Sequence, residues 1–185
     1  LQSNINYLQK TIKSEIIAMI KANAYGFGDV LIAKKMEAFG INYFGVADFE
    51  EGIRLRDNGI NSQIMVMNPS ISSMPMLLKH KLEPVIYNME ILNEMIRQTD
   101  TLLTNKNLCP IHIKINTGMN RWGFDNYEIP GLIKRLKRCS KNIIIKSLYS
   151  HFASADDHEN LFAIKQNNNF SKIKNQFKEA FNYSI

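Results

Sequence analysis

Six short apolar runs alternate with stretches of helical periodicity, and this alternation is the feature of the sequence that most restricts the fold. The runs are Ile16–Ile20, Tyr43–Val46, Ile64–Met67, Pro84–Tyr87, Ile111–Ile115 and Ile143–His151. Strands that alternate with helices at this spacing form βαβ units, whose strands lie parallel in one sheet. The sequence therefore predicts an α/β fold with six parallel strands.

Helices are predicted before, between and after these strands. They are expected over about residues 1–12, 28–39, 48–58, 88–97, 127–138 and 159–182, with a short Met- and Leu-rich helix after Pro69 and with Asp48 as an N-cap. A closed barrel of eight βα units needs about 250 residues, whereas the chain has 185 and starts at Leu1 inside a helical pattern. We therefore expect about six of the eight units of a barrel, in a piece of a longer protein. A complete open sheet of six strands is the alternative.

Composition narrows the classes of function. The 23 Lys and Arg residues against 17 Asp and Glu residues give a net charge of +6, which suits an anionic small ligand. No basic run is interleaved with aromatic residues and no apolar stretch has the length of a membrane helix, so neither a nucleic-acid nor a membrane partner is expected. Cys109 and Cys139 lack metal-ligand spacing, so no metal site and no disulfide framework are predicted. Together with the absence of a signal-peptide pattern, these features predict a cytoplasmic protein.

The first apolar run ends at Lys21, which is the first catalytic candidate. A buried parallel strand that ends in a lysine brings one amine to the carboxyl edge of the sheet. Gly26 and Gly28 permit positive φ angles or a close approach of the backbone to a ligand, and Tyr25 offers a hydroxyl for a phosphate. A solvated lysine at a strand end is the plainer interpretation. A nucleotide-binding loop is less favoured, because Leu31 stands where its third glycine would fall.

Two further polar clusters follow the fifth and sixth strands. In a barrel, catalytic groups gather at the carboxyl ends of the strands. Arg121 presents a planar fork suited to a carboxylate, and Lys114 beside it is expected to need a compensating anion. His151 follows the same pattern, although a lone histidine at a strand end is more often a structural residue than a catalyst. Solvent-exposed Lys114 and Arg121 are the alternative. Glu50 and Arg54 are expected to form a surface pair worth a few tenths of a kcal/mol.

These three segments resemble motifs of the alanine racemase family. The segment that begins at Lys21 matches seven of the eight positions of Lys-Ala-Asn-Ala-Tyr-Gly-His-Gly, with Phe27 in place of the histidine. The segment from Lys114 is similar to Lys-x-Asp-Thr-Gly-Met-x-Arg-x-Gly, with Asn116 in place of the aspartate. The segment Ser150–Asp157 is similar to Thr-His-Phe-Ala-x-Ala-Asp-Glu. The motifs occur in the family's order, and the resemblance extends over nearly the whole chain.

The resemblance implies a (βα)8 TIM barrel of pyridoxal 5'-phosphate (PLP) fold type III. It implies that Lys21 binds PLP covalently and serves as one of two bases, that Tyr25 and His151 bind or line the cofactor, and that Arg121 helps to hold the substrate carboxylate. In this family the lysine at the position of Lys114 is commonly carbamylated and orients the arginine. The activity implied is the interconversion of L- and D-alanine for peptidoglycan precursors, by a homodimer.

The same resemblance implies that residues 1–185 form only part of the catalytic unit. In the family, the second base is a tyrosine from a C-terminal β-domain of the partner subunit, and the last two βα units supply most of the phosphate site. We therefore expect negligible racemase activity from residues 1–185 alone. An inactive or non-enzymatic PLP-binding barrel is the alternative, and fusion to an enzyme of the D-Ala-D-Ala branch of cell-wall synthesis is a third hypothesis. The substrate's side chain stays open, because racemases of larger amino acids share the fold.

Overall fold

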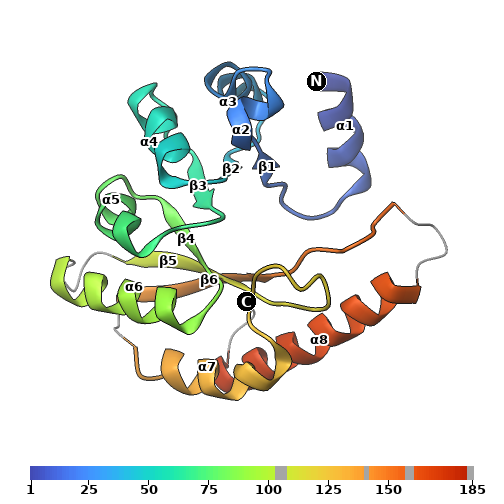
Figure 1. The fold of residues 1–185 in the computed structure, drawn as a ribbon. Coiled ribbons are helices and arrows are strands. Elements are labelled where there is room, and N and C mark those ends of the chain that lie inside the picture. Colours follow the sequence, from blue (N-terminus) through green and yellow to red (C-terminus); the bar gives the residue numbers. More distant parts are fainter. Residues whose placement is uncertain (103–107, 140–141, 157–160, 183–185) are drawn as a thin grey trace. The chain divides into compact units, whose positions relative to one another are not determined.

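The computed structural model describes residues 1–102, 108–139, 142–156 and 161–182 (Figure 1). Helices and strands alternate along the chain as the sequence predicts. In order, the elements are α1 (Gln2–Thr11), β1 (Ala18–Met19), α2 (Lys21–Tyr25), α3 (Asp29–Ala38), β2 (Tyr43–Val46), α4 (Phe49–Asp57), β3 (Gln63–Val66), η1 (Ile71–Ser73), α5 (Met74–Lys79), β4 (Glu83–Ile86), α6 (Met89–Leu102), β5 (Cys109–Lys114), η2 (Asn126–Glu128), α7 (Ile129–Leu136), β6 (Ile143–Tyr149) and α8 (Leu161–Phe181).

The strands are hydrogen-bonded in the order in which they occur in the chain, from β1 to β6, and every neighbouring pair is parallel. A doubly wound open sheet reverses its strand order at a switch point, and no reversal occurs among these six strands. Successive parallel strands joined by helices are the repeating units of a βα barrel. The strand order therefore favours the barrel over the open sheet.

The chain divides into two compact units, which are described one at a time. Unit 1 comprises residues 1–69 and 76–84, and unit 2 comprises residues 70–75 and 85–185. In unit 1, β2 pairs with β1 and β3, and β3 pairs with the first residues of β4. In unit 2, the last residues of β4 pair with β5, and β5 pairs with β6.

Burial follows the pattern expected for parallel strands covered on both faces. All four residues of β2 are buried, and Phe44, Val46, Ile64 and Val66 of unit 1 have no exposed surface. In unit 2, Ile111 and Ile113 of β5 are fully buried, as is Leu92 of α6. Strand β6 differs, because six of its seven residues are half-buried or exposed.

Three details differ from the sequence prediction. The first strand is only two residues long, and Lys21 begins α2 instead of ending the strand. Helix α6 continues to Leu102, beyond the predicted end near residue 97. Arg54 does not pair with Glu50 as expected: its guanidinium binds the buried carboxylate of Asp29 on α3. A carboxylate that faces the helix from a neighbouring element offers a better partner than an exposed one on the same helix. Residues 159–160 of the predicted last helix lie outside the described residues.

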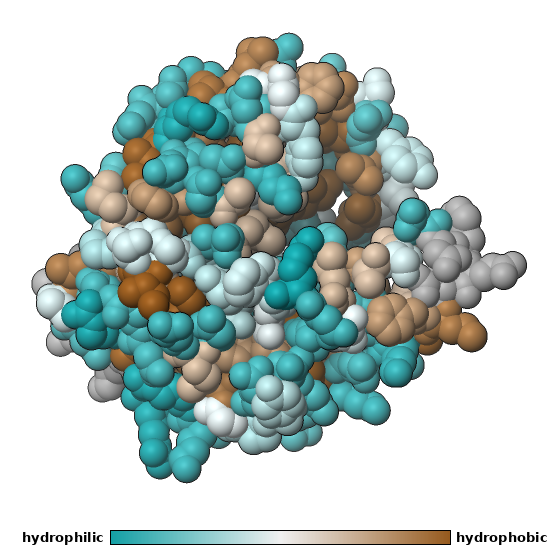
Figure 2. All heavy atoms as spheres, in the orientation of Figure 1, coloured by the Kyte–Doolittle hydropathy of each residue, from teal (hydrophilic) through white to brown (hydrophobic). Residues whose placement is uncertain are grey.

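The predicted N-cap of α4 is confirmed. Asp48 caps α4, since its side chain accepts a hydrogen bond from the Glu51 backbone N–H at 3.0 Å. None of the helices in the described parts of the chain is both long and apolar enough to cross a membrane. On the face shown in Figure 2, apolar side chains form separate patches among hydrophilic ones.

Candidate active site

The residues that follow β1 form a left-handed turn. Ala22, Asn23, Ala24 and Tyr25 have φ angles between 51° and 55°, although none of them is glycine. We call residues 20–28 the lysine turn. A left-handed helical conformation costs about 1–2 kcal/mol for each L-residue. Such a run of strained residues therefore persists only where surrounding contacts hold it.

Two side chains hold the lysine turn from either side. The carboxylate of Glu51 on α4 accepts the Ala22 N–H at 2.6 Å and the Ala47 N–H at 2.7 Å. The side-chain oxygen of Asn23 accepts the N–H of Asp29, the first residue of α3, at 3.1 Å. Asparagine tolerates the left-handed region better than most residues do. The turn is thus tied to both helices that flank it in unit 1.

Both sequence-predicted residues of this turn are accessible. Lys21 is half-buried, and Tyr25 is 63% exposed. Gly26 and Gly28 adopt φ angles of 93° and 86°, as predicted for glycines that close a turn. Lys21 therefore presents its amine from a fixed backbone at the carboxyl end of β1.

The other sequence-predicted residues lie in unit 2. Lys114 ends β5 and is buried, and it is paired in the sheet register with Tyr149 of β6. Its Nζ lies 5.8 Å from the centre of the Tyr149 ring, within the range of a cation–π contact. Burial raises the pKa of Tyr149, and the positive charge of Arg121 acts in the opposite direction. Lys114 and Tyr149 therefore lie together, while Arg121 is exposed and acts on the Tyr149 hydroxyl through its charge.

The loop that carries Arg121 is organised by Asn116. We call residues 115–124 the arginine loop. The side-chain oxygen of Asn116 accepts the N–H groups of Gly118 and Asn120 at 3.1 and 3.0 Å. Its amide donates to Oδ1 of Asn120 at 2.9 Å and to Oδ1 of Asp125 at 2.7 Å. An aspartate at this position has no N–H to donate, so the local hydrogen bonding fits the asparagine of this sequence.

Gly123 closes the arginine loop against the end of β5. Its φ angle is 120°, and a Cβ there would lie 2.8 Å from the backbone nitrogen of Asn116 and from the carbonyl carbon of Ile115. The Phe124 N–H donates to the Lys114 carbonyl at 2.9 Å. The chain therefore returns to the strand it has just left, and only glycine fits at this point.

Gln166 of α8 joins the arginine loop to the segment after β6, and sequence reasoning missed it. It is 1% exposed. Its amide donates to the Thr117 hydroxyl at 3.1 Å and to the His151 carbonyl at 3.0 Å, and its oxygen accepts the Ala153 N–H at 3.0 Å. The only signal in the sequence is a polar residue on the buried face of a predicted helix, which indicates a satisfied hydrogen-bonding group.

β6 ends at Tyr149, two residues before the predicted end of this strand, so His151 lies in the segment that follows it, where it is exposed. Together with Thr117, Tyr149, Gln166 and Phe170, it lines a cavity of about 310 Å³. The cavity lies within unit 2 at the carboxyl ends of β5 and β6. No group of three His, Cys, Asp or Glu side chains suited to a metal ion occurs in the described ranges of the chain.

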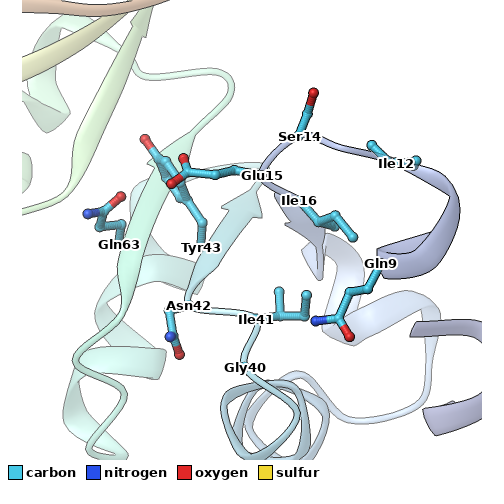
Figure 3. Close-up of a pocket in the computed structure, with 10 residues that line it drawn as sticks. All are labelled: Gln9, Ile12, Ser14, Glu15, Ile16, Gly40, Ile41, Asn42, Tyr43 and Gln63. Carbon is cyan, nitrogen blue, oxygen red and sulfur yellow. The ribbon is translucent and has the colours of Figure 1, made fainter. Parts of the chain in front are cut away.

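A second cavity of about 310 Å³ lies in unit 1, lined by residues such as Gln9, Glu15, Tyr43 and Gln63 (Figure 3). Tyr43 and Gln63 are the first residues of β2 and β3, so this cavity lies at the amino ends of the strands. Burial, a hydrogen bond to Glu83 and the charge of Glu15 raise the pKa of Tyr43. In βα barrels this end supports stability and the opposite end carries the chemistry. The cavity is therefore not the candidate active site.

The fold and its polar loops define a class of protein: a parallel βα protein with a lysine after the first strand and with polar groups at the carboxyl ends of the fifth and sixth strands. A family model described as "Alanine racemase, N-terminal domain" matches residues 1–185. The chain belongs to this family. The prediction of a (βα)8 barrel represented by six βα units is confirmed.

Relatives and solved structures agree with this assignment. The chain is 33% identical to an alanine racemase of Treponema denticola over 186 aligned positions, which cover 97% of this chain and 48% of that protein. It is 36% identical to an alanine racemase of Clostridium tetani over 168 positions, covering 89% of this chain and 42% of that protein.

Among solved structures, an alanine racemase of Clostridium difficile 630 superposes with a TM-score of 0.88 at 29% identity, covering 96% of this chain and 47% of that one. A complex of this alanine racemase with cycloserine superposes with a TM-score of 0.88 at 28% identity, covering 98% of this chain and 50% of that one. The chain thus spans about half the length of the curated relatives it matches.

Proposed function

We propose that this chain is the N-terminal barrel portion of a PLP-dependent alanine racemase that interconverts L- and D-alanine. The observation that carries the proposal is Lys21, whose amine stands on the lysine turn at the carboxyl end of β1. Family membership supports the reaction class, and the names of the relatives support alanine as the substrate.

The residues present fit PLP. Covalent attachment of PLP needs an accessible amine that is not consumed by an ion pair, and no ion pair with Lys21 occurs among the described residues. The exposed Tyr25 hydroxyl, four residues further on, is a donor for the phosphate. When bound, PLP supplies an electron sink that makes the Cα proton of an amino acid removable.

Each candidate residue has a role in this proposal. Lys21 holds the cofactor and, once displaced by the substrate, moves a proton at one face of Cα. Arg121 binds the substrate carboxylate through its planar guanidinium. Lys114, as a carbamate, orients Arg121, and the cation–π geometry with Tyr149 belongs to the unmodified lysine. His151 lines the cofactor site in this proposal, as the family motif implies, and it also lines the cavity within unit 2.

The proposal extends to the rest of the protein. We propose two further βα units and a C-terminal β-domain that carries the tyrosine of the second base, in a cytoplasmic homodimer that supplies D-alanine for peptidoglycan precursors. Six of the seven residues of the edge strand β6 are half-buried or exposed, which supports further strands beside it. The short span of this chain relative to its curated relatives supports the additional domain.

Borohydride trapping followed by peptide mapping tests the cofactor, and a racemisation assay tests the reaction. In the protein as its reading frame encodes it, we expect PLP on the peptide that contains Lys21 and conversion of L-alanine to D-alanine. Labelling of Lys21 without racemisation would favour the non-enzymatic PLP-binding alternative. PLP on another lysine, or on none, would refute the proposal.

A further inference from the structure

Glu51 makes contacts that its place in helix α4 does not require. It is the third residue of the helix, and in a capping box a glutamate at this position reaches back to the N–H of the N-cap residue. Here the N-cap is Asp48, whereas the two oxygens of Glu51 accept the N–H groups of Ala47 and Ala22. The bond to Ala22 joins α4 to a segment 29 positions away in the sequence. Capping therefore does not explain it.

The Ala22 N–H belongs to the peptide unit that joins Lys21 to Ala22. Fixing this planar unit fixes ψ of Lys21 and φ of Ala22. These two angles determine how the chain enters the left-handed turn and in which direction the Lys21 side chain leaves the backbone. The distances of 2.6 and 2.7 Å are those of charge-assisted hydrogen bonds.

The second contact of Glu51 connects its carboxylate to the backbone next to the sheet. Ala47 directly follows β2, and its carbonyl accepts the Asn68 N–H from the segment after β3 at 2.9 Å. Its own N–H binds Glu51 at 2.7 Å. Glu51 therefore ties the lysine turn to the segments that directly follow two neighbouring strands, β2 and β3, whose last residues Val46 and Val66 are fully buried.

We propose that Glu51 is a positioning residue that sets the direction of the Lys21 amine through the Lys21–Ala22 peptide unit. This inference rests on the proposed function, because it assigns a purpose to the geometry of Lys21. Glu51 does not itself touch the substrate. Its carboxylate acts through the backbone, and the strained turn is the element that it holds.

The test uses Glu51→Ala and Glu51→Gln in the protein as its reading frame encodes it. The glutamine side chain has nearly the same size as glutamate, but only its oxygen can accept an N–H. Its NH₂ group is itself a donor and cannot bond to the other backbone N–H, so one of the two hydrogen bonds is lost. Amide hydrogen exchange at Ala22, measured without cofactor, reports whether its N–H is still hydrogen-bonded to the side chain at position 51. The equilibrium uptake of PLP on Lys21, followed by absorbance and by reductive trapping, reports the position of the amine.

In Glu51→Ala we expect exchange at Ala22 to rise and PLP affinity to fall by about tenfold or more. In Glu51→Gln we expect smaller changes in the same directions, because loss of either bond breaks the link between Ala22 and Ala47 and the remaining bond is no longer charge-assisted. Glu50→Gln, an exposed neighbour on the same helix, is the matched control and is expected to change neither value. Should Glu51→Ala fail to fold, the near-isosteric Glu51→Gln carries the test. Unchanged exchange at Ala22, or faster exchange with unchanged PLP affinity, overturns the proposal. If the unaltered protein takes up no PLP, the proposed function fails, while the exchange measurement still decides whether Glu51 holds the turn.

Discussion

The lysine turn and the arginine loop both follow a parallel strand, but they are held by different chemistry. The lysine turn is held by the carboxylate of Glu51 in addition to the amide oxygen of Asn23. Neutral amides, those of Asn116 and Gln166, hold the arginine loop and its neighbour after β6. Charge-assisted hydrogen bonds are roughly twice as strong as neutral ones.

Backbone strain explains why the two regions differ. In the lysine turn, the positive φ angles fall on four consecutive residues with side chains, Ala22 to Tyr25. In the arginine loop they fall on Gly118, Asn120 and Gly123, and glycine and asparagine adopt such angles at low cost. The strained region needs the stronger bonds, whereas a loop with glycines at its sharp points is stable with neutral ones.

The largest expected effect is the loss of PLP attachment, which we assign to the lysine turn and not to the arginine loop. Lys21→Ala removes the only amine on the lysine turn, so we expect complete loss of trapped PLP at this peptide. Unfolding free energy is expected to change by no more than about 0.5 kcal/mol, because this side chain forms no ion pair with the described residues. Peptide mapping and thermal unfolding check the two values. Lys34→Ala, an exposed lysine on α3, should leave PLP uptake unchanged, and loss of uptake there would contradict the assignment.

Gly123→Ala tests whether glycine lowers the strain of the arginine loop. The new Cβ would meet backbone atoms of Ile115 and Asn116 at 2.8 Å, so we expect a loss of about 2–4 kcal/mol in unfolding free energy. Denaturant unfolding measures it. Gly131→Ala in α7, where a Cβ meets nothing within 4 Å, should instead stabilise by about 0.5–1 kcal/mol. Equal effects at both glycines would refute the strain argument.

Gln166→Leu tests the hydrogen bonds by which the neutral Gln166 amide joins the arginine loop to the segment after β6. It removes three hydrogen bonds and leaves the Ala153 N–H and the His151 carbonyl without this partner, so we expect a loss of about 2–3 kcal/mol. Chemical denaturation of the variant gives the value. Asn168→Leu, an exposed position on the same helix, is expected to change stability by less than about 0.5 kcal/mol. A loss of similar size in both variants would show that leucine on α8, and not the lost bonds, is the cause.

Asn116→Asp restores the residue of the alanine racemase motif but removes both N–H donors to Asn120 and Asp125. It also places a second carboxylate beside Asp125. We expect a loss of about 1–2 kcal/mol in unfolding free energy. Asn126→Asp adds the same charge at an exposed site in η2 and serves as the control. A stabilising Asn116→Asp would show that the loop accommodates either residue.

The smallest expected effect comes from Glu94, a carboxylate on α6. Its hydrogen bonds serve as a reference for the charge-assisted hydrogen bonds of Glu51. Hydrogen bonds from Arg97 and Gln98 lower the pKa of Glu94 from 4.5 to about 2. A lowered folded-state pKa stabilises the fold above the unfolded value and ceases to do so as pH falls through the folded value. Glu94→Gln should therefore be slightly less stable at neutral pH, with the difference vanishing between pH 4.5 and about 2. Glu90→Gln on the same helix is the control, and a difference that persists at lower pH would contradict this account.

Much of the fold could be predicted from the sequence because its signals are local. The run Tyr43–Val46 is a strand with the predicted bounds, and Asp48 caps the predicted helix. The family motifs also identify Lys21 and Arg121 as candidates from the order of residues alone. The pairing of Arg54 was predicted wrongly, because spacing along one helix does not show that Asp29 faces it from α3.

The sequence by itself determined the alternation of strands and helices and the residues that carry chemical groups, since apolar periodicity and motif spacing involve only near neighbours. Only the tertiary structure decided how those groups are held. Glu51 reaches Ala22 across 29 positions, and Gln166 reaches Thr117 across 49. Such bonds form only after the strands have paired and the helices have packed. The left-handed path of the lysine turn likewise depends on partners that local propensity opposes.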